Sequence, residues 1–251
     1  MSRLNGKVAL ITGAAQGLGA VYAKAMAAEG ARVVVSDVLD CQPVVDAITQ
    51  SGGEAIAQIC DVTENSALTG SVAGAEAAFG PIEILVTNAA LFAELRRRPF
   101  ENIDEDEWDR VMRVNVRGTF QTIKAVVPSM RRAGRGKIIN ISSGTVLAGV
   151  PQFLHYVTSK GAIMAMTRSL SRELGADNIC VNSIAPGLTV SDGLHGHPDY
   201  DEALEMNRNT RIFQRDMLPD DLIGTVLYLA SPDSDFLTGQ MINIDGGRTH
   251  Y

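Results

Sequence analysis

Short apolar runs alternate with amphipathic stretches from residue 7 to the end of the chain. Seven such apolar runs are typical of buried strands. They are residues 8–11, 32–35, 55–59, 82–86, 137–141, 179–184 and 241–244. Helical patterns lie between them, near residues 17–29, 64–79, 105–133, 154–175 and 219–230. Strands separated by helices predict right-handed crossovers and a parallel sheet. The pattern therefore predicts an α/β Rossmann fold with a doubly wound, seven-stranded parallel sheet.

The chain shows no linker, repeat or low-complexity tract, and its 251 residues suit one domain spanning residues 1–251. The least regular stretch is 188–218, which contains Ser191-Asp-Gly and His195-Gly-His-Pro. An irregular insert of that length in a compact domain is functional or mobile.

Composition narrows the partners and the compartment. A formal net charge of −7 argues against a nucleic-acid surface, and the short basic runs 96–98 and 131–132 predict a solvated loop and a helix end. Cys41, Cys60 and Cys180 are isolated, so neither a disulfide framework nor a zinc site is predicted. The N-terminus shows no charged-then-apolar leader, and no apolar run approaches transmembrane length. We expect a cytoplasmic protein without a membrane or nucleic-acid partner.

A glycine-rich loop follows the first apolar run. Gly13, Gly17 and Gly19 give the spacing Gly-x-x-x-Gly-x-Gly, with Gln16 and Leu18 between them. Glycine permits the tight turn and lets the backbone approach a pyrophosphate, while the next helix offers unpaired N–H groups to the phosphates. The loop therefore predicts a dinucleotide site.

Asp37 ends the second apolar run, 24 residues beyond Gly13. A carboxylate there would accept hydrogen bonds from the adenosine ribose and repel a 2′-phosphate, which favours NAD over NADP. Residues 14–19 contain no Arg to offset that repulsion. The alternative is a strand-end Asp that caps a turn.

Tyr156 and Lys160 lie four residues apart in a predicted helix and so share one face. The Lys160 charge would lower the pKa of the Tyr156 phenol from its ordinary value of about 10 and make it a usable base. Alone, this spacing also fits an amphipathic helix with a half-buried Tyr and a solvated Lys. Other motifs in a fixed order favour an active site: Thr12-Gly13 to Gly19, Asn88-Ala89-Ala90, Asn115, Ser143 and Pro186-Gly187.

Together these motifs resemble the short-chain dehydrogenase/reductase (SDR) family, from Gly6-Lys7-Val8 to Asp245-Gly246-Gly247. The resemblance implies a catalytic tetrad of Asn115, Ser143, Tyr156 and Lys160. Ser143 precedes Tyr156 by 13 residues, the family's usual separation. On this resemblance Ser143 holds the substrate oxygen, Tyr156 transfers the proton, Lys160 holds the nicotinamide ribose, and Asn115 supports a water relay. A backbone-bonded polar residue remains the alternative for Asn115.

The resemblance also assigns the cofactor contacts: Gly13, Gln16, Gly17, Leu18, Gly19, Asp37, Asp61, Val62, Asn88, Ala89, Tyr156, Lys160, Pro186, Gly187, Thr189 and Ser191. From spacing alone, Asp61 fits a helix start as well as an adenine contact. The family usually has Asn-Asn-Ala-Gly where this chain has Thr87 and Ala90 at the ends of the motif. The Ala90 methyl is expected to narrow the backbone conformations open to that turn.

The expected substrate walls are mainly apolar: residues 91–93, 145–147, 152–153 and the segment 188–213. Ser143, Thr145, Phe153 and Tyr156 are the predicted substrate contacts. Such walls suit a ketone or secondary alcohol with a compact hydrophobic or aromatic substituent. Within the family, the chain resembles catabolic alcohol dehydrogenases, which implies a ring-bearing substrate. The resemblance further implies that 188–218 closes over the substrate and is the main specificity element. It also implies a homotetramer that packs through 105–133 and 154–175.

The leading hypothesis is an NAD-dependent secondary-alcohol dehydrogenase. The alternatives are an NADPH-dependent 3-oxoacyl-ACP reductase and a non-catalytic NAD-sensing regulator, although such regulators commonly lose the Tyr or Lys. His155 is expected to pack or to line the pocket edge. His195 and His197 lack a third ligand in the sequence, so no metal site is predicted.

Overall fold

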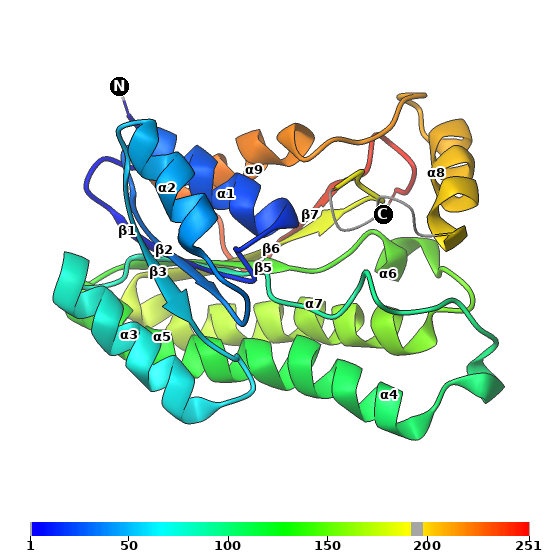
Figure 1. Cartoon of the computed structure of the whole chain (residues 1–251), viewed down its shortest axis with the longest axis horizontal. Helices are drawn as coiled ribbons and strands as arrows, with labels where there is room; N and C mark the ends of the chain where they lie inside the picture. Colours follow the sequence, from blue (N-terminus) through cyan, green and yellow to red (C-terminus); the bar gives the residue numbers. More distant parts are fainter. Residues whose placement is uncertain (1, 192–197, 251) are drawn as a thin grey trace.

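The computed structural model describes residues 2–191 and 198–250. Within them the chain forms a seven-stranded parallel sheet in the order β3-β2-β1-β4-β5-β6-β7 (Figure 1). The strands are β1 Val8–Thr12, β2 Arg32–Asp37, β3 Glu54–Ile59, β4 Ile84–Thr87, β5 Gly136–Ile141, β6 Ile179–Pro186 and β7 Met241–Ile244. The order reverses between β1 and β4, which is where open α/β sheets bind ligands. The predicted doubly wound parallel fold is confirmed.

Helices cover both faces of the sheet (Figure 1). The α-helices are α1 Gly17–Ala28, α2 Gln42–Gln50, α3 Asn65–Phe79, α4 Glu105–Val111, α5 Thr119–Ala133, α6 Thr145–Ala148, α7 Leu154–Leu174, α8 Pro198–Thr210 and α9 Asp220–Ala230. A π-helical turn, Met112–Gly118, joins α4 to α5, and short 3₁₀ turns span Phe100–Asn102, Gly175–Asp177 and Pro232–Ser234. None of the described helices is long and apolar enough to cross a membrane.

The core lies in two layers because successive strand residues point to opposite faces of the sheet. Ala9 and Ile11 of β1 pack in the layer beneath α1, α2 and α9, whereas Val8 and Leu10 pack in the layer that contains α3, α5 and α7. Both layers are apolar, and this explains why the strands appear in the sequence as continuous apolar runs rather than as an alternating pattern.

The prediction for residues 188–218 is wrong in part, because α8 occupies 198–210. This helix is strongly polar, so it lacks the broad apolar stripe by which the other helices were predicted. The nine-residue α2 was also not predicted. His195 and His197 lie outside the described residues.

Candidate active site

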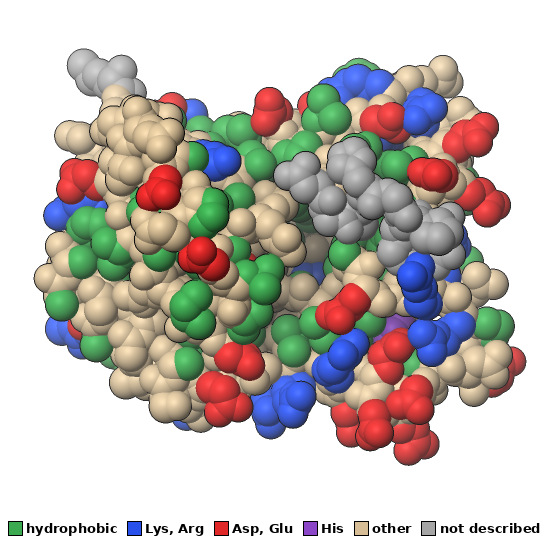
Figure 2. All heavy atoms as spheres, in the orientation of Figure 1, with side chains coloured by type: hydrophobic (Ala, Val, Ile, Leu, Met, Phe, Trp, Pro, Cys, Tyr) green, Lys and Arg blue, Asp and Glu red, His purple; other side chains and the backbone are tan. Residues whose placement is uncertain are grey.

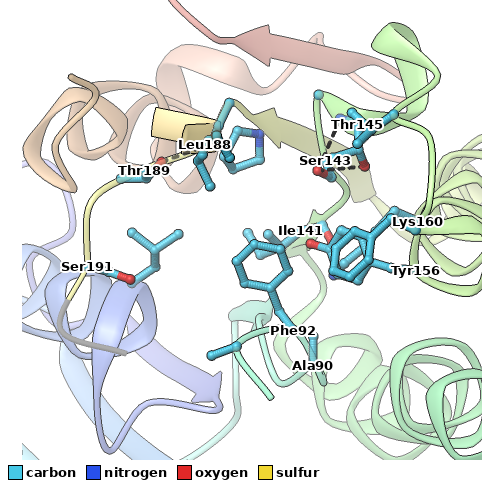
Figure 3. Close-up of a pocket in the computed structure, with 18 of the residues that line it drawn as sticks. Ala90, Phe92, Ile141, Ser143, Thr145, Tyr156, Lys160, Leu188, Thr189 and Ser191 are labelled. Atoms are coloured by element: carbon cyan, nitrogen blue, oxygen red, sulfur yellow. Dashed lines mark hydrogen bonds between the residues drawn. The ribbon is translucent and has the colours of Figure 1, made fainter. Parts of the chain in front are cut away.

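A cavity of about 280 Å³ lies at the carboxyl ends of the central strands, next to the point where the strand order reverses (Figure 3). Figure 2 shows that the molecular surface is hollowed near the middle of this view. The cavity is lined by the glycine loop, the segments after β4, β5, β6 and β7, the start of α7, and α8. Predicted site residues in its wall are Gln16, Gly17, Leu18, Asn88, Ser143, Thr145, Phe153, Tyr156, Lys160, Pro186, Gly187, Thr189 and Ser191.

The glycine loop is held by close backbone contacts. Gly13 has a φ of +64°, and a Cβ placed there would lie 2.7 Å from the Ala89 Cα. A Cβ on Gly19 would overlap the Gly13 carbonyl oxygen and lie 2.6 Å from Asn88 Nδ2. Asn88 Nδ2 donates to the carbonyl oxygens of Thr12 (3.1 Å) and Gly13 (2.8 Å). Gly13, Gly19 and Ala89 therefore shape the loop from behind and do not line the cavity.

The front of the loop suits a phosphate group. Gly17 lines the cavity with a φ of +56°, and a Cβ there would meet no atom within 4 Å. The side chain of Gln16, the N-cap residue of α1, makes no capping hydrogen bond within the described chain. The N–H groups of the first helical turn are thus left for an anion, and the helix dipole favours one. These residues fit a dinucleotide pyrophosphate.

Asp37 lies at the end of β2, beside the glycine loop. Its Oδ2 accepts a hydrogen bond from Ala15 N at 3.0 Å, and its Oδ1 accepts one from Leu39 N at 3.1 Å. The turn-capping alternative is thus realised, and it leaves the carboxylate next to the loop, as a ribose contact requires. Asp61 Oδ1 accepts from Thr63 N at 2.8 Å, which closes a turn before α3; the helix itself begins at Asn65, so Asp61 is not at the helix start. Asp61 is exposed, and neither it nor the buried Val62 lines the cavity.

Ser143 and Tyr156 lie on the same side of the cavity, with Lys160 beside Tyr156 (Figure 3). Thr145 donates to Ser143 Oγ twice, from Oγ1 at 3.0 Å and from its backbone N at 3.2 Å. Because Ser143 Oγ accepts both of these bonds, its own proton is left to donate towards an oxygen in the cavity. Burial raises the pKa of Tyr156, and its hydrogen bond with Ser143 opposes that rise.

Lys160 is buried, with 3% of its surface exposed, and its Nζ donates to the Ile141 carbonyl oxygen at 2.8 Å. The Nζ lies 5.7 Å from the centre of the Tyr156 ring. Burial lowers the pKa of Lys160 to about 8. The expected net lowering of the Tyr156 pKa is therefore not found in this structure: Lys160 is not among the causes of the shift, and loss of hydration dominates at both groups. A solvated Lys beside a half-buried Tyr is also excluded.

Asn115 lies inside the π-helical turn and away from the cavity wall. Its Oδ1 accepts from Leu91 N at 2.8 Å, and its Nδ2 donates to Leu91 O at 3.2 Å and to Ser159 Oγ at 3.1 Å. The side chain thus ties the segment after β4 to α7, as the backbone-bonded alternative described. π-helical turns often occur at functional sites. A role for Asn115 in a water relay stays a prediction.

Four aromatic rings form the substrate side of the cavity. The Phe92 ring centre lies 5.0 Å from that of Tyr156 and 5.6 Å from that of Tyr200, and those of Phe153 and Tyr156 are 5.0 Å apart. Figure 3 shows Leu188, Thr189 and Ser191 across the cavity from Phe92 and Tyr156. The helix α8 adds Tyr200, Ala203, Met206 and Asn207 to the wall. Leu91, Val146, Leu147 and Gln152, also expected in the wall, are absent from it among the described residues.

Sequence reasoning missed several wall residues, namely Leu95, Arg97, Val150, Asp245 and Arg248. The solvated-loop prediction for 96–98 is wrong for Arg97, which lines the cavity, and Arg98 pairs with Glu107 at 3.1 Å. The sequence of three consecutive arginines does not indicate which of them lines a cavity, because the direction of each side chain depends on the fold. The helix-end prediction for 131–132 is confirmed, because both arginines lie in the last turn of α5.

His155 is fully buried beside Tyr156, and its Nε2 lies 2.9 Å from Glu107 Oε1 of α4. It packs away from the cavity, in agreement with the packing alternative. Within the described part of the chain, no three His, Cys, Asp or Glu side chains gather as metal ligands would.

The two departures from the usual Asn-Asn-Ala-Gly motif are accommodated locally. Thr87 Oγ1 donates to Asn140 Oδ1 at 2.8 Å, which links β4 to β5. Ala90 lines the cavity and is not among the described non-glycine residues with positive φ. The turn therefore needs no glycine at this position, and the extra methyl brings no backbone strain.

Known proteins resemble this chain over nearly its full length. The family model described as "Enoyl-(Acyl carrier protein) reductase" matches residues 13–249. A 3-alpha-(or 20-beta)-hydroxysteroid dehydrogenase of Mycobacterium bovis is 38% identical over 245 residues, covering 98% of this chain and 90% of the relative. The chain belongs to the short-chain dehydrogenase/reductase family.

Two further similarities support this SDR assignment. Trans-4-hydroxycyclohexanecarboxylate dehydrogenase of Sinomonas cyclohexanicum is 36% identical over 255 residues, covering 98% of this chain and 94% of the relative. The solved structure of a double Phe-to-Tyr mutant of a Serratia marcescens short-chain dehydrogenase/reductase superposes with a TM-score of 0.90 at 30% identity, covering 99% of this chain and 100% of that one. This SDR is accordingly an oxidoreductase that uses a nicotinamide cofactor.

Proposed function

We propose that the chain is an NAD-dependent oxidoreductase that interconverts a secondary alcohol and a ketone on a small, hydrophobic, ring-bearing substrate. The observation that carries this proposal is the convergence of Ser143, Tyr156 and Lys160 on one cavity whose other wall is aromatic. The Mycobacterium and Sinomonas relatives act, by their names, on a hydroxysteroid and a hydroxycyclohexanecarboxylate, and both are ring-bearing alcohols.

The cofactor would supply hydride chemistry, and this chain's residues would position it. The first turn of α1, at Gln16 to Leu18, would bind the pyrophosphate, and Asp37 the adenosine ribose. Lys160 would hold the nicotinamide ribose, while Pro186, Gly187 and Thr189 would line the nicotinamide side. A carboxylate at Asp37 would repel a 2′-phosphate, which supports NAD over NADP.

Tyr156 is the proposed general acid and base. In the reductive direction its raised pKa keeps the phenol protonated and able to donate to a forming alkoxide. In the oxidative direction it must accept the alcohol proton, so the oxidation rate should rise with pH as the phenolate fraction grows. Ser143 would donate to the same substrate oxygen, because Thr145 fills its acceptor positions.

Assembly and location remain part of this proposal. Phe120 of α5 is 48% exposed and Leu154 of α7 is 45% exposed, which supports a homotetramer packed through these helices. Cys41, Cys60 and Cys180 are free, in keeping with a cytoplasmic protein. Sedimentation velocity of the purified chain tests the assembly: a tetramer supports it and a monomer overturns it.

The test of function is formation of NADH or NADPH by the purified protein with aliphatic, alicyclic and aryl secondary alcohols. We expect turnover with NAD on ring-bearing alcohols, and a shift of about tenfold or more towards NADP in Asp37→Asn. The matched control is Asp40→Asn, which removes the charge of an exposed carboxylate that accepts a hydrogen bond from Gln42 N. It should leave the cofactor preference unaltered. NADPH-dependent reduction of a 3-oxoacyl thioester, with no alcohol oxidation, would instead favour the ACP-reductase alternative.

A further inference from the structure

We infer, building on the proposed function, that the substrate carries a carboxylate and that Arg97 binds it at the aromatic end of the cavity. The substrate class would then be a ring-bearing hydroxy acid and its keto acid. Three features carry this inference: the position of Arg97, its lack of a partner, and the charges of the other wall residues.

The position of Arg97 is determined by its neighbours in the segment after β4. Leu95 is 1% exposed and packs in one cluster with Phe153 and Tyr156. The backbone N of Arg98 donates to Gln152 O at 2.9 Å, which holds the segment against the start of α7. Arg97 lies between these two anchors and lines the cavity, so its guanidinium belongs to the end of the cavity where the aromatic rings gather.

The Arg97 charge has no partner in residues 2–191 and 198–250. Its Nε is buried without a hydrogen-bond partner. The nearby carboxylates are engaged elsewhere: Glu94 pairs with Arg110 at 3.5 Å, and Glu107 contacts both Arg98 and His155. Figure 2 shows acidic side chains gathered over α4 with basic side chains beside them. A buried, unpaired N–H of a guanidinium is costly unless a ligand satisfies it.

The other charged residues of the wall are already bonded. Asp245 accepts four hydrogen bonds, from the backbone N atoms of Gly247, Arg248 and Thr249 and from the Thr249 hydroxyl. Arg248 Nη1 donates to Asn207 Oδ1 at 2.6 Å, and Lys160 donates to Ile141 O. Lys160 is in addition the proposed ribose contact. Among the described wall residues, Arg97 is therefore the cation that neither bonds to another described group nor has a proposed role in cofactor binding, and the wall carries more positive than negative groups.

A carboxylate fits this arrangement best. The planar guanidinium matches a carboxylate in a two-bond geometry, and the mainly apolar cavity suits a single compact anion. A ring packed against the aromatic cluster of Phe92 and Phe153 would place a hydroxyl near Ser143 and Tyr156 at one end and the carboxylate near Arg97 at the other. Arg97 would thus select the substrate and take no part in proton transfer.

Binding of one charged and one neutral probe tests this directly. Cyclohexanecarboxylate and cyclohexanecarboxamide would be titrated calorimetrically into the full-length protein with NADH present. We expect the carboxylate to bind about 10- to 100-fold more tightly than the amide, and Arg97→Gln to abolish that preference. Arg97→Lys should restore part of it. Arg110→Gln, which removes a nearby positive charge outside the cavity wall, is the matched control and should retain the preference.

The carboxylate site is overturned if the wild-type protein binds carboxylate and amide equally, or if Arg97→Gln keeps the preference. Turnover separates this failure from failure of the proposed function. Oxidation of neutral cyclohexanols, of 4-hydroxycyclohexanecarboxylate and of its methyl ester would be measured with NAD and NADP. Equal turnover of acid and ester, unaltered in Arg97→Gln, contradicts the carboxylate site and leaves the dehydrogenase intact. Carboxylate binding that depends on Arg97, without turnover of any of these alcohols, supports the carboxylate site and contradicts the dehydrogenase function.

Discussion

The two sides of the cavity are built differently. On the cofactor side, backbone atoms of the glycine loop pack against Asn88 and Ala89 so closely that a single Cβ on Gly13 or Gly19 would collide. On the substrate side, side chains from the segment after β4, from α7 and from α8 meet across open space. Changes on the cofactor side should therefore damage stability and cofactor binding together, whereas changes on the substrate side should alter chemistry or selectivity in a folded protein.

The largest expected effect lies on the substrate side. Tyr156→Phe removes the proposed proton-transfer group but keeps the ring contacts with Phe92 and Phe153, so we expect kcat/KM to fall about 10³-fold with little loss of stability. Steady-state kinetics with thermal unfolding checks this. Tyr22→Phe is the matched control, because the buried Tyr22 hydroxyl has no hydrogen-bond partner and lies outside the described cavity wall. Activity within tenfold of wild type would remove Tyr156 from the mechanism.

The second prediction concerns Lys160, which lies between the two sides. Burial lowers its pKa to about 8, so between pH 8 and about 10 the folded chain binds fewer protons than the unfolded chain. The free energy of unfolding should therefore rise with pH across this window, by at most about 3 kcal/mol. Urea unfolding at several pH values measures this, and Lys160→Met should lose the rise. Parallel pH dependences in both proteins would show that Lys160 is not desolvated. Tyr156, whose pKa is raised from its ordinary value of about 10, affects the free energy of unfolding mainly above this pH window.

The third prediction tests the cofactor side. Gly19→Ala places a methyl group against Gly13 O and Asn88 Nδ2, so we expect a loss of about 1–3 kcal/mol of stability together with weaker NADH binding. In the control Gly70→Ala, the new methyl group on α3 is exposed and contacts no other atom, so the free energy of unfolding should rise by about 0.5–1 kcal/mol. Denaturant unfolding and fluorescence titration with NADH measure both. A Gly19→Ala protein as stable as wild type would show that the two sides do not differ in this way.

The smallest effect should come from Ala90, where this chain departs from its family. Ala90 is not in a left-handed conformation, so Ala90→Gly should act mainly by raising the conformational entropy of the unfolded chain. We expect the free energy of unfolding to fall by about 0.4–1 kcal/mol. Cofactor affinity should stay within about twofold of wild type. A gain in stability or a large gain in affinity would mean that the family's glycine provides something that Ala90 lacks.

Local sequence signals carried much of the fold and part of the site. The strands were predictable because continuous apolar runs are the local signature of a parallel sheet buried on both faces, as in Val33 to Val35. The glycine loop was predictable because its glycines are required by a tight turn and by close backbone contacts, and the turn spans only a few residues of sequence. Tyr156 and Lys160 share a helix face for the same reason: an interval of four residues is about one helical turn.

Tertiary structure decided what depends on distant partners. Arg97 lines the cavity because Leu95 packs in one cluster with Tyr156 and Arg98 bonds to Gln152, contacts that join segments about 55 to 60 residues apart. The Asn115 side chain is directed to Leu91 and Ser159 by the same packing. The direction of the Tyr156 and Lys160 pKa shifts follows from burial, which spacing does not encode, because loss of hydration is set by everything that surrounds a group once the chain is folded.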